Sequence, residues 1–193
     1  MKCIRKTVAA AMISLMTSAA SAIPVTYNID SSHTYPRFSF SHYGYTTQAA
    51  TFNKTTGKVM FDAAAKRGSV EIVVDMKSVN TGHNHFNEHI QSDDLLDTNK
   101  YPQATFKSTK VLFDGDKPQL IEGMLTIKGI AKPVTLTVTN FQASSHPMMK
   151  KPVLGANAFT VIKRSDFNAG KYTPHVGDEL RIDIAIEAIA QPQ

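Results

Sequence analysis

The stretch GMLTIKGIAKPVTLTV, residues 123–138, decides the fold class of this chain. It predicts two β-strands joined by a tight turn at Lys128-Gly129, because glycine takes a positive φ without steric cost. Pro133 lacks an N–H and belongs near a strand start or at an edge. Beyond it, apolar residues and threonines alternate over 134–139. This period of two predicts antiparallel β structure with one face on an interior.

The same alternation recurs on both sides of this stretch. It is found at 25–29, 38–42, 59–61, 70–76, 106–113, 120–125 and 182–186. Many strands separated by turn signals indicate an all-β sandwich or a closed barrel, and closure removes the edges that would otherwise pair with other chains. Helical periodicity is confined to one short amphipathic piece in the 84–96 region.

Two segments are predicted as irregular connections longer than ordinary hairpin loops. Residues 78–103 contain three histidines and three aspartates, and residues 142–156 contain two prolines and a pair of lysines. Loops of this length are often functional or mobile. For the second segment, a solvated connection is the alternative.

The first residues predict a secretory signal. Lys2, Arg5 and Lys6 precede a short apolar stretch, 7–16, that is too short to span a bilayer. Small residues at 20–22 form a cleavage site, so we expect residues 1–22 to be a signal peptide removed after Ala22 and the protein to be periplasmic. An uncleaved anchor or a buried N-terminal helix is the alternative.

The composition of residues 23–193 limits the partners and the cysteine chemistry that the protein can have. Without the three basic residues of the signal, the chain has 18 basic and 16 acidic residues, which gives a formal charge of +2. This near-neutral charge argues against a nucleic-acid partner. Cys3 is the only cysteine, so residues 23–193 have no disulfide and no thiolate. With no internal repeat and no linker, residues 23–193 are expected to form one domain.

Seven segments also carry a family likeness through their order and spacing. They are YNIDSSHT at 27–34, FSHYG at 40–44, EHIQSDDLLD at 88–97, YPQATFKST at 101–109, the stretch at 123–138, IKRSDF at 162–167 and VGDEL at 176–180. Together they resemble, almost from end to end, the YceI-like polyisoprenoid-binding family. This chain departs from the family in having Asn168 where glycine is usual, Leu95-Leu96 without an aromatic residue, and His83-Asn84-His85 in place of commonly polar or charged residues.

The resemblance implies a lipocalin-like antiparallel barrel of about eight strands with an apolar lumen. It implies a periplasmic protein that holds a long-chain polyisoprenoid or a similar amphipathic lipid, of isoprenoid quinone or polyprenyl phosphate type. Transport, storage and stress protection are the corresponding roles. The bound lipid is the expected ligand, and no obligatory cofactor is expected. Length and charge leave monomer and homodimer open.

Candidate ligand-binding residues are found on the predicted strands in which apolar and polar residues alternate. The apolar residues expected to line the lumen are Phe38, Phe40, Phe106, Phe113 and Ile184. His42, on the same strand face as two of them, is a candidate for contact with a headgroup, with an ordinary core histidine as the alternative. Arg37 and Arg164 are candidates for a pyrophosphate, because guanidinium matches such oxygens bidentately. For both arginines a surface ion pair is the alternative.

Other function classes have weaker signals. His83, His85 and His89 offer metal-compatible spacing on a helix, which makes a histidine-based metal-binding or redox-accessory protein the alternative function. An exposed polar segment explains the same histidines. An enzyme acting on a lipid headgroup is a third hypothesis, but no nucleophile elbow, H-E-x-x-H or phosphate-binding glycine loop is present, so a non-enzyme is expected. Met148-Met149 beside Lys150-Lys151 would permit transient membrane contact.

Overall fold

The computed structural model describes residues 24–192, so the predicted signal peptide lies outside the described residues. The strands are β1 (Val25–Ile29), β2 (Arg37–His42), β3 (Thr46–Phe52), β4 (Thr55–Asp62), β5 (Arg67–Asp75), β6 (Val79–Asn80), β7 (Gln103–Asp114), β8 (Lys117–Ile127), β9 (Ile130–Ser145), β10 (Pro152–Lys163) and β11 (Glu179–Ala190). Within this range, α1 (Asn84–Gln91) is the one α-helix, and η1 (Met76–Ser78) and η2 (Arg164–Phe167) are short 3-10 turns.

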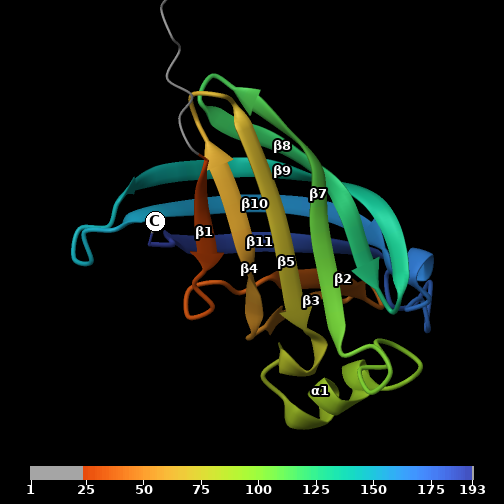
Figure 1. Cartoon of the computed structure of the whole chain (residues 1–193). Coiled ribbons are helices and arrows are strands. Elements are labelled where there is room, and N and C mark those ends of the chain that lie inside the picture. The colour runs from red at the N-terminus through yellow and green to blue at the C-terminus, as the bar shows by residue number, and fades with distance from the viewer. Residues whose placement is uncertain (1–23, 193) are drawn as a thin grey trace, which may run out of the picture.

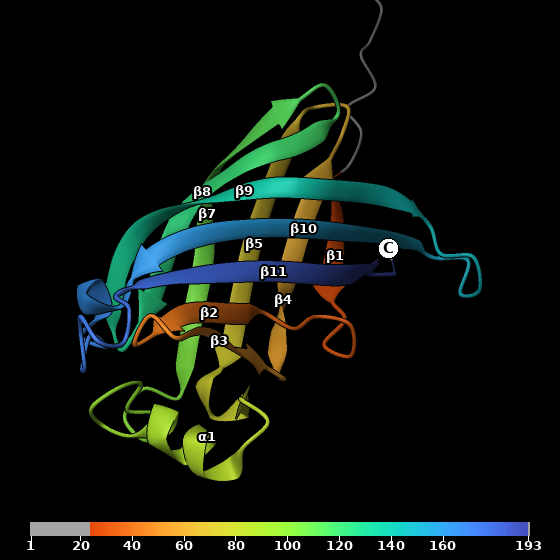
Figure 2. The same ribbon diagram turned by 180° about the vertical axis from the view of Figure 1, so that it is seen from behind.

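Eight of the strands close into an antiparallel barrel in the order β1-β4-β5-β7-β8-β9-β10-β11, and β11 returns to β1 (Figure 1). The second edge of β11 is divided between two partners. Its residues 188–190 pair with β1, and residues 181–183 pair with β2. From there β2, β3 and β6 continue the sheet as a flap at the end of the barrel near α1 (Figure 2). The predicted all-β barrel with one short helix is confirmed.

The hairpin at 123–138 forms as its sequence predicts. Lys128 and Gly129 have φ values of 51° and 74°, and positive φ at both central residues is the geometry that suits the twist of two-residue hairpins. Pro133 pairs with Met124 of β8, and β9 gains β10 as its second neighbour only from Thr137 onward. The proline therefore lies where β9 has one partner strand, which is where proline is tolerated.

The predicted irregular connection at 142–156 is wrong. β9 and β10 pair through this segment from Pro152↔Ser145 onward, and only residues 146–151 connect them. The side chains of 142–145 are exposed on both faces. Because neither face is buried, no apolar alternation marks this part of the hairpin, although its backbone pairs normally.

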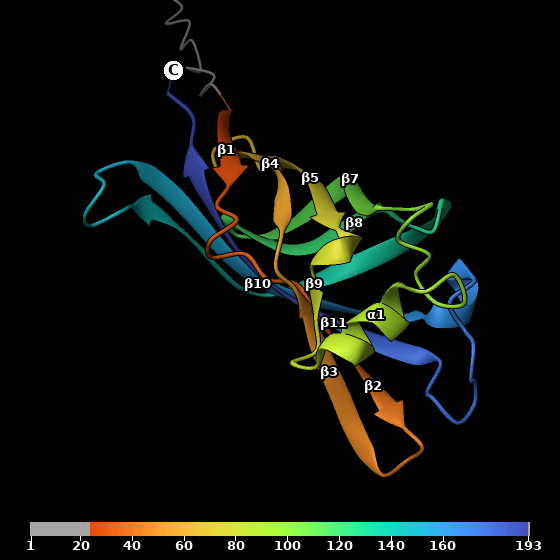
Figure 3. The same cartoon turned by 90° about the horizontal axis from the view of Figure 1, so that it is seen from below.

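The interior consists of two apolar clusters. The barrel cluster is centred on buried residues including Phe106, Leu136 and Leu154, and the second cluster lies among β2, β3, β6 and α1 around Phe38 and Ile90. Figure 3 shows α1 beside β2 and β3 at this end of the barrel. No helix within residues 24–192 has the length and apolar character needed to cross a membrane.

Candidate functional site

An apolar cavity of about 480 Å³ runs through the barrel interior and under the flap. Ligand pockets in proteins have volumes of about 300–1,000 Å³. The wall is made by residues that strand alternation turns inward, among them Val70, Ile72, Phe106, Leu136, Ala158 and Ile184. Ala156 and Ala158 occupy two successive inward positions of β10, and their short side chains leave volume that larger residues would fill.

The opposite end of the barrel is packed with aromatic rings. Phe61 lies between Phe141, at 4.9 Å between ring centroids, and Phe113, at 6.2 Å. None of these three residues lines the cavity. The predicted lining role of Phe113 is therefore not supported by its position. Irregularities in the β7–β8 register at 108–110 and 112–113 interrupt the simple alternation that placed it beside Phe106.

The other predicted lining residues lie in the cavity wall. Phe38, Phe40 and His42 follow one another along the inward side of β2, and Phe106 and Ile184 belong to the barrel. The rings of Phe38 and Phe40 are stacked with centroids 6.2 Å apart. Alternation was sufficient to find these residues because their strands pair without a bulge at these positions.

The cavity reaches the surface beside the β2–β3 hairpin, α1 and the loop after η2. Its exposed lining residues there include Tyr43, which is 52% exposed, and Tyr172, which is 41% exposed. Tyr43 stacks on His175 at 5.8 Å, and His89 of α1 lies 5.8 Å from the ring of Tyr172. We call this ring of phenol and imidazole side chains the mouth. Arg37 is also among the lining residues and is exposed, but it begins β2 at the strand end away from the β2–β3 hairpin, and strand alternation turns its side chain away from the inward face of Phe38.

Two lysines join the chain segments on one side of the mouth. Lys128 Nζ donates to the carbonyl oxygen of Asp93 at 3.1 Å and to that of Asn168 at 2.9 Å. Lys171 forms an ion pair with Asp94, and this hydrogen bond raises the pKa of Lys171. The segment after α1 and the loop after η2 are thereby tied together. We call these two contacts the latch.

Arg164 is buried and holds the loop after η2 instead of facing a ligand. All three guanidinium nitrogens donate to neutral oxygens at 2.6–3.4 Å. The acceptors are the carbonyl groups of Ala169, Lys171, Val176 and Gly177 and the hydroxyl of Thr173. Burial lowers the pKa of Arg164. Five donors matched to five acceptors leave none for a pyrophosphate, so the predicted anion-binding role of Arg164 is not supported.

The same loop explains one departure from the family pattern. Asn168 ends η2 with φ 53° and ψ 34°, the left-handed region. Asparagine is one of the few non-glycine residues that visit this region routinely. The position therefore keeps the backbone that a glycine would give. Nearby, the Asp178 carboxylate accepts from Ser165 N at 2.8 Å and from Ser165 Oγ at 2.6 Å.

His83, His85 and His89 do not come together as a group of metal ligands. His83 caps the start of α1 without a side-chain bond, exposed His85 lies 3.8 Å from Glu88, and His89 faces Phe86 and Tyr172. Within residues 24–192, the one group of three candidate ligands with atoms inside 4.8 Å is Asp30, His33 and Glu187. No spacing pattern in the sequence marks this group, because Glu187 is distant in the chain, although Asp30 and His33 belong to a segment that carries the family resemblance.

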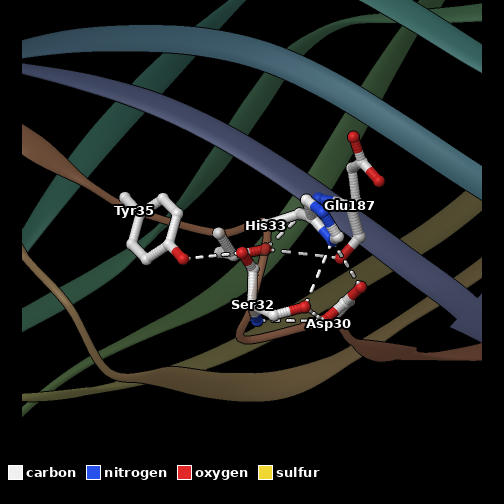
Figure 4. Close-up of polar contacts among 6 residues, drawn as sticks. Asp30, Ser32, His33, Tyr35 and Glu187 are labelled. Carbon is white, nitrogen blue, oxygen red and sulfur yellow. Dashed lines mark hydrogen bonds and ion pairs between the residues drawn. The ribbon is translucent and has the colours of Figure 1, made fainter.

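Hydrogen bonds within the connection from β1 to β2 hold Asp30 and His33 of that group close together (Figure 4). Asp30 accepts from Ser32 Oγ at 2.6 Å and lies 2.8 Å from His33 Nδ1. Bonds from Ser32 and then His33 lower the pKa of Asp30 to about 2, and Asp30 raises the pKa of His33. Buried Thr34 accepts from Glu187 N at 3.2 Å, which attaches the connection to β11. The group stabilises a turn outside the cavity.

Comparison with known proteins matches the whole barrel. A model of the YceI-like domain covers residues 27–188. Protein YceI of Shigella flexneri is 38% identical over 184 residues, which span 92% of this chain and 94% of that protein. A UPF0312 protein of Pseudomonas putida is 35% identical over 193 residues, with 97% and 99% covered.

Solved structures share the same architecture. BcnA of Burkholderia cenocepacia gives a TM-score of 0.70 at 29% identity and covers 83% of this chain and 99% of its own. A polyisoprenoid binding domain from Saccharophagus degradans, implicated in plant cell wall breakdown, gives 0.63 at 16% identity, with 86% and 99% covered, a likeness of fold alone. From the match at 27–188 and from relatives more than 30% identical along nearly the full length, this chain belongs to the YceI-like domain family.

Proposed function

We propose that this protein binds a long, mainly apolar lipid, such as an isoprenoid chain, inside its barrel. The observation that carries the proposal is the cavity of about 480 Å³ whose barrel wall is almost entirely aliphatic and aromatic. The fold neighbour from Saccharophagus degradans is a polyisoprenoid binding domain, which supports the ligand class without assigning it to this chain.

The energy available from such a cavity is large. Sheltering about ten methylene-sized groups at about 0.8 kcal/mol each contributes about 8 kcal/mol before the cost of ordering the chain. The aromatic rings around Phe61 pack the far end of the barrel, and the exposed tyrosines of the lining lie at the mouth. A lipid therefore enters with one end inside the barrel and the other directed toward solvent.

The mouth supplies polar contacts for the emerging end. His42 and His89 line it with imidazole groups, and Tyr43 and Tyr172 with phenol groups. Tyrosine suits such a boundary because its ring is apolar and its hydroxyl is polar.

A binding role, rather than catalysis, fits these features. We propose that the protein is exported to the periplasm and carries or stores a lipid that water would not dissolve. Membrane contact is part of this proposal, and the exposed Met148 and Met149 between β9 and β10 are candidates for it. Monomer and homodimer both remain compatible with it.

Native mass spectrometry of protein purified from an exporting host, without detergent, tests this function. We expect a population heavier than the polypeptide, which loses its extra mass on extraction with organic solvent. Protein that carries no lipid and takes up none from vesicles would contradict the proposal.

A further inference from the structure

One hydroxyl group in the cavity wall has no partner. Thr55 is the first residue of β4, its side chain is 0% exposed, and it belongs to the cavity lining. Its Oγ1 makes no hydrogen bond to any residue in the described part of the chain. Strand alternation directs it to the barrel interior, as it does Val59 on the same strand.

An unpaired buried hydroxyl is unusual because burial without a hydrogen bond is costly. The other fully buried threonines within residues 24–192 have partners. Thr34 Oγ1 bonds to the backbone of Glu187, and Thr98 Oγ1 donates to Gln91 Oε1 at 3.4 Å. Valine has the same shape as threonine and would fill the position of Thr55 without this cost. Ser92 Oγ is the other buried hydroxyl without a partner within residues 24–192, but it does not line the cavity. The position of Thr55 in the cavity wall therefore points to a partner that enters the cavity.

The surroundings of Thr55 indicate which kind of group can serve as the hydrogen-bonding partner of its hydroxyl. Its partner across the ladder is Val74 of β5, and Val74 and Met76 are apolar lining residues. The buried cation of the lining, Arg164, has its donors engaged with neutral oxygens of its own loop. The wall beside Thr55 therefore offers a neutral hydrogen-bonding group, and the buried arginine of the lining has no donor left for a charged headgroup.

We propose that Thr55 Oγ1 is the hydrogen-bonding partner of an oxygen atom carried by a neutral lipid in the cavity. The lipid is an oxygenated one, with a hydroxyl or a carbonyl group, rather than a pure hydrocarbon or a phosphorylated chain. The hydroxyl of Thr55 donates to that oxygen and also accepts from a lipid hydroxyl. This inference rests on the proposed lipid binding and specifies the lipid class.

Binding includes a small rearrangement of the wall, because the Thr55 side chain is fully buried. Met76 is two residues beyond Val74 and lines the same cavity, and its unbranched thioether chain adapts readily. A lipid oxygen near this end of β4 then gains a bond in a site from which water is excluded, where hydrogen bonds are electrostatically strong.

The test compares Thr55→Val with Thr56→Val. Thr56 is the next residue of β4 and is exposed, so its variant is a matched control with the same chemical change outside the cavity. The probes are geranylgeraniol, its monophosphate and the hydrocarbon phytane, each measured by displacement of a fluorescent fatty acid. A neutral hydrogen bond corresponds to about threefold to tenfold in affinity.

We expect Thr55→Val to lose about threefold to tenfold in affinity for geranylgeraniol. Its affinity for phytane should not change, and its melting temperature should be equal to or above that of the wild type. Thr56→Val should match the wild type with all three probes.

Each other outcome is decisive. If wild type binds both neutral probes and Thr55→Val binds geranylgeraniol equally well, the role of Thr55 is overturned and lipid binding stands. Tighter binding of the monophosphate than of the alcohol would overturn the neutral class. If none of the probes binds the wild type, the proposed function itself fails.

Discussion

The ring of Phe106 lies against Gly123, where an added Cβ would come within 2.5 Å of the ring atom Cζ and 2.6 Å of the Lys107 carbonyl oxygen. Gly123 belongs to the sequence stretch that predicts the β8–β9 hairpin. Its lack of a side chain gives the Phe106 ring its place in the cavity wall. A residue that the sequence marks only as part of a strand therefore shapes the lumen.

Gly123→Ala is expected to lower the free energy of unfolding by about 1–3 kcal/mol, because backbone and ring must both shift. Gly155→Ala is the control, since its Cβ would meet its nearest atom at an ordinary 3.7 Å. Urea denaturation of the two variants and the wild type measures the difference. Equal stability of the two variants would contradict the close packing at Gly123.

Arg164→Lys should destabilise the protein by about 3 kcal/mol or more, because lysine cannot satisfy the carbonyl groups that the buried guanidinium bonds. Arg181→Lys is the control. Arg181 forms an exposed ion pair with Asp183, and such pairs contribute about 0–1 kcal/mol. Denaturant titration distinguishes the two variants. A cost for Arg164→Lys no larger than that of Arg181→Lys would contradict the structural role.

Loss of the Lys128 contact of the latch should speed the release of bound lipid, although the Lys171–Asp94 pair remains. Lys128→Met removes both hydrogen bonds that tie Asp93 to Asn168 beside the mouth, while keeping a long unbranched side chain at this positive-φ position. We expect faster transfer of a fluorescent lipid to vesicles in stopped-flow measurements, with less than about 1 kcal/mol of lost stability. Lys110→Met, at an exposed position of β7, is the control. Identical transfer rates for the two variants would exclude the Lys128 contact as a barrier.

The Asp30–His33 pair predicts a pH-dependent stability. The pKa of His33 is raised above 6.5, so its contribution is complete below that pH and is lost as pH rises through the folded value. The pKa of Asp30 is lowered from 3.8 to about 2, so its contribution is present above 3.8 and is lost as pH falls toward 2. Both residues therefore contribute fully to the stability of the folded protein between about pH 3.8 and pH 6.5.

His33→Ala should therefore be less stable than wild type by the largest margin near about pH 5, with the margin shrinking above the raised pKa of His33. Thermal melts from pH 4 to 9 would measure it. His85→Ala, at an exposed position of α1, serves as the control. A margin that does not vary with pH would rule out this pair as the cause.

Sequence patterns predict this fold where one strand face is buried. Alternation correctly predicts the hairpin at 123–138, the inward side of β2 and the inward position of Ile184 on β11. Alternation fails where it has no physical basis. At 142–145 both faces are exposed, and at Phe113 the register is interrupted.

The roles of the polar residues depend on contacts between distant segments. Arg164 has the guanidinium that a phosphate would need, but its own loop occupies every donor. Thr55 is one threonine among many in the sequence. Only the packed barrel shows that its hydroxyl is buried without a partner.

The most direct measurement is the stoichiometry of lipid bound by Ala158→Phe, compared with Ala185→Phe and the wild type. Ala158 lines the cavity opposite Ile184 on β11, whereas Ala185 is exposed on that strand. Titration with a fluorescent lipid should give one chain bound per wild-type and Ala185→Phe molecule, and little or none for Ala158→Phe, whose ring obstructs the lumen. Equal binding by Ala158→Phe, with its fold intact, would contradict lipid binding inside the barrel.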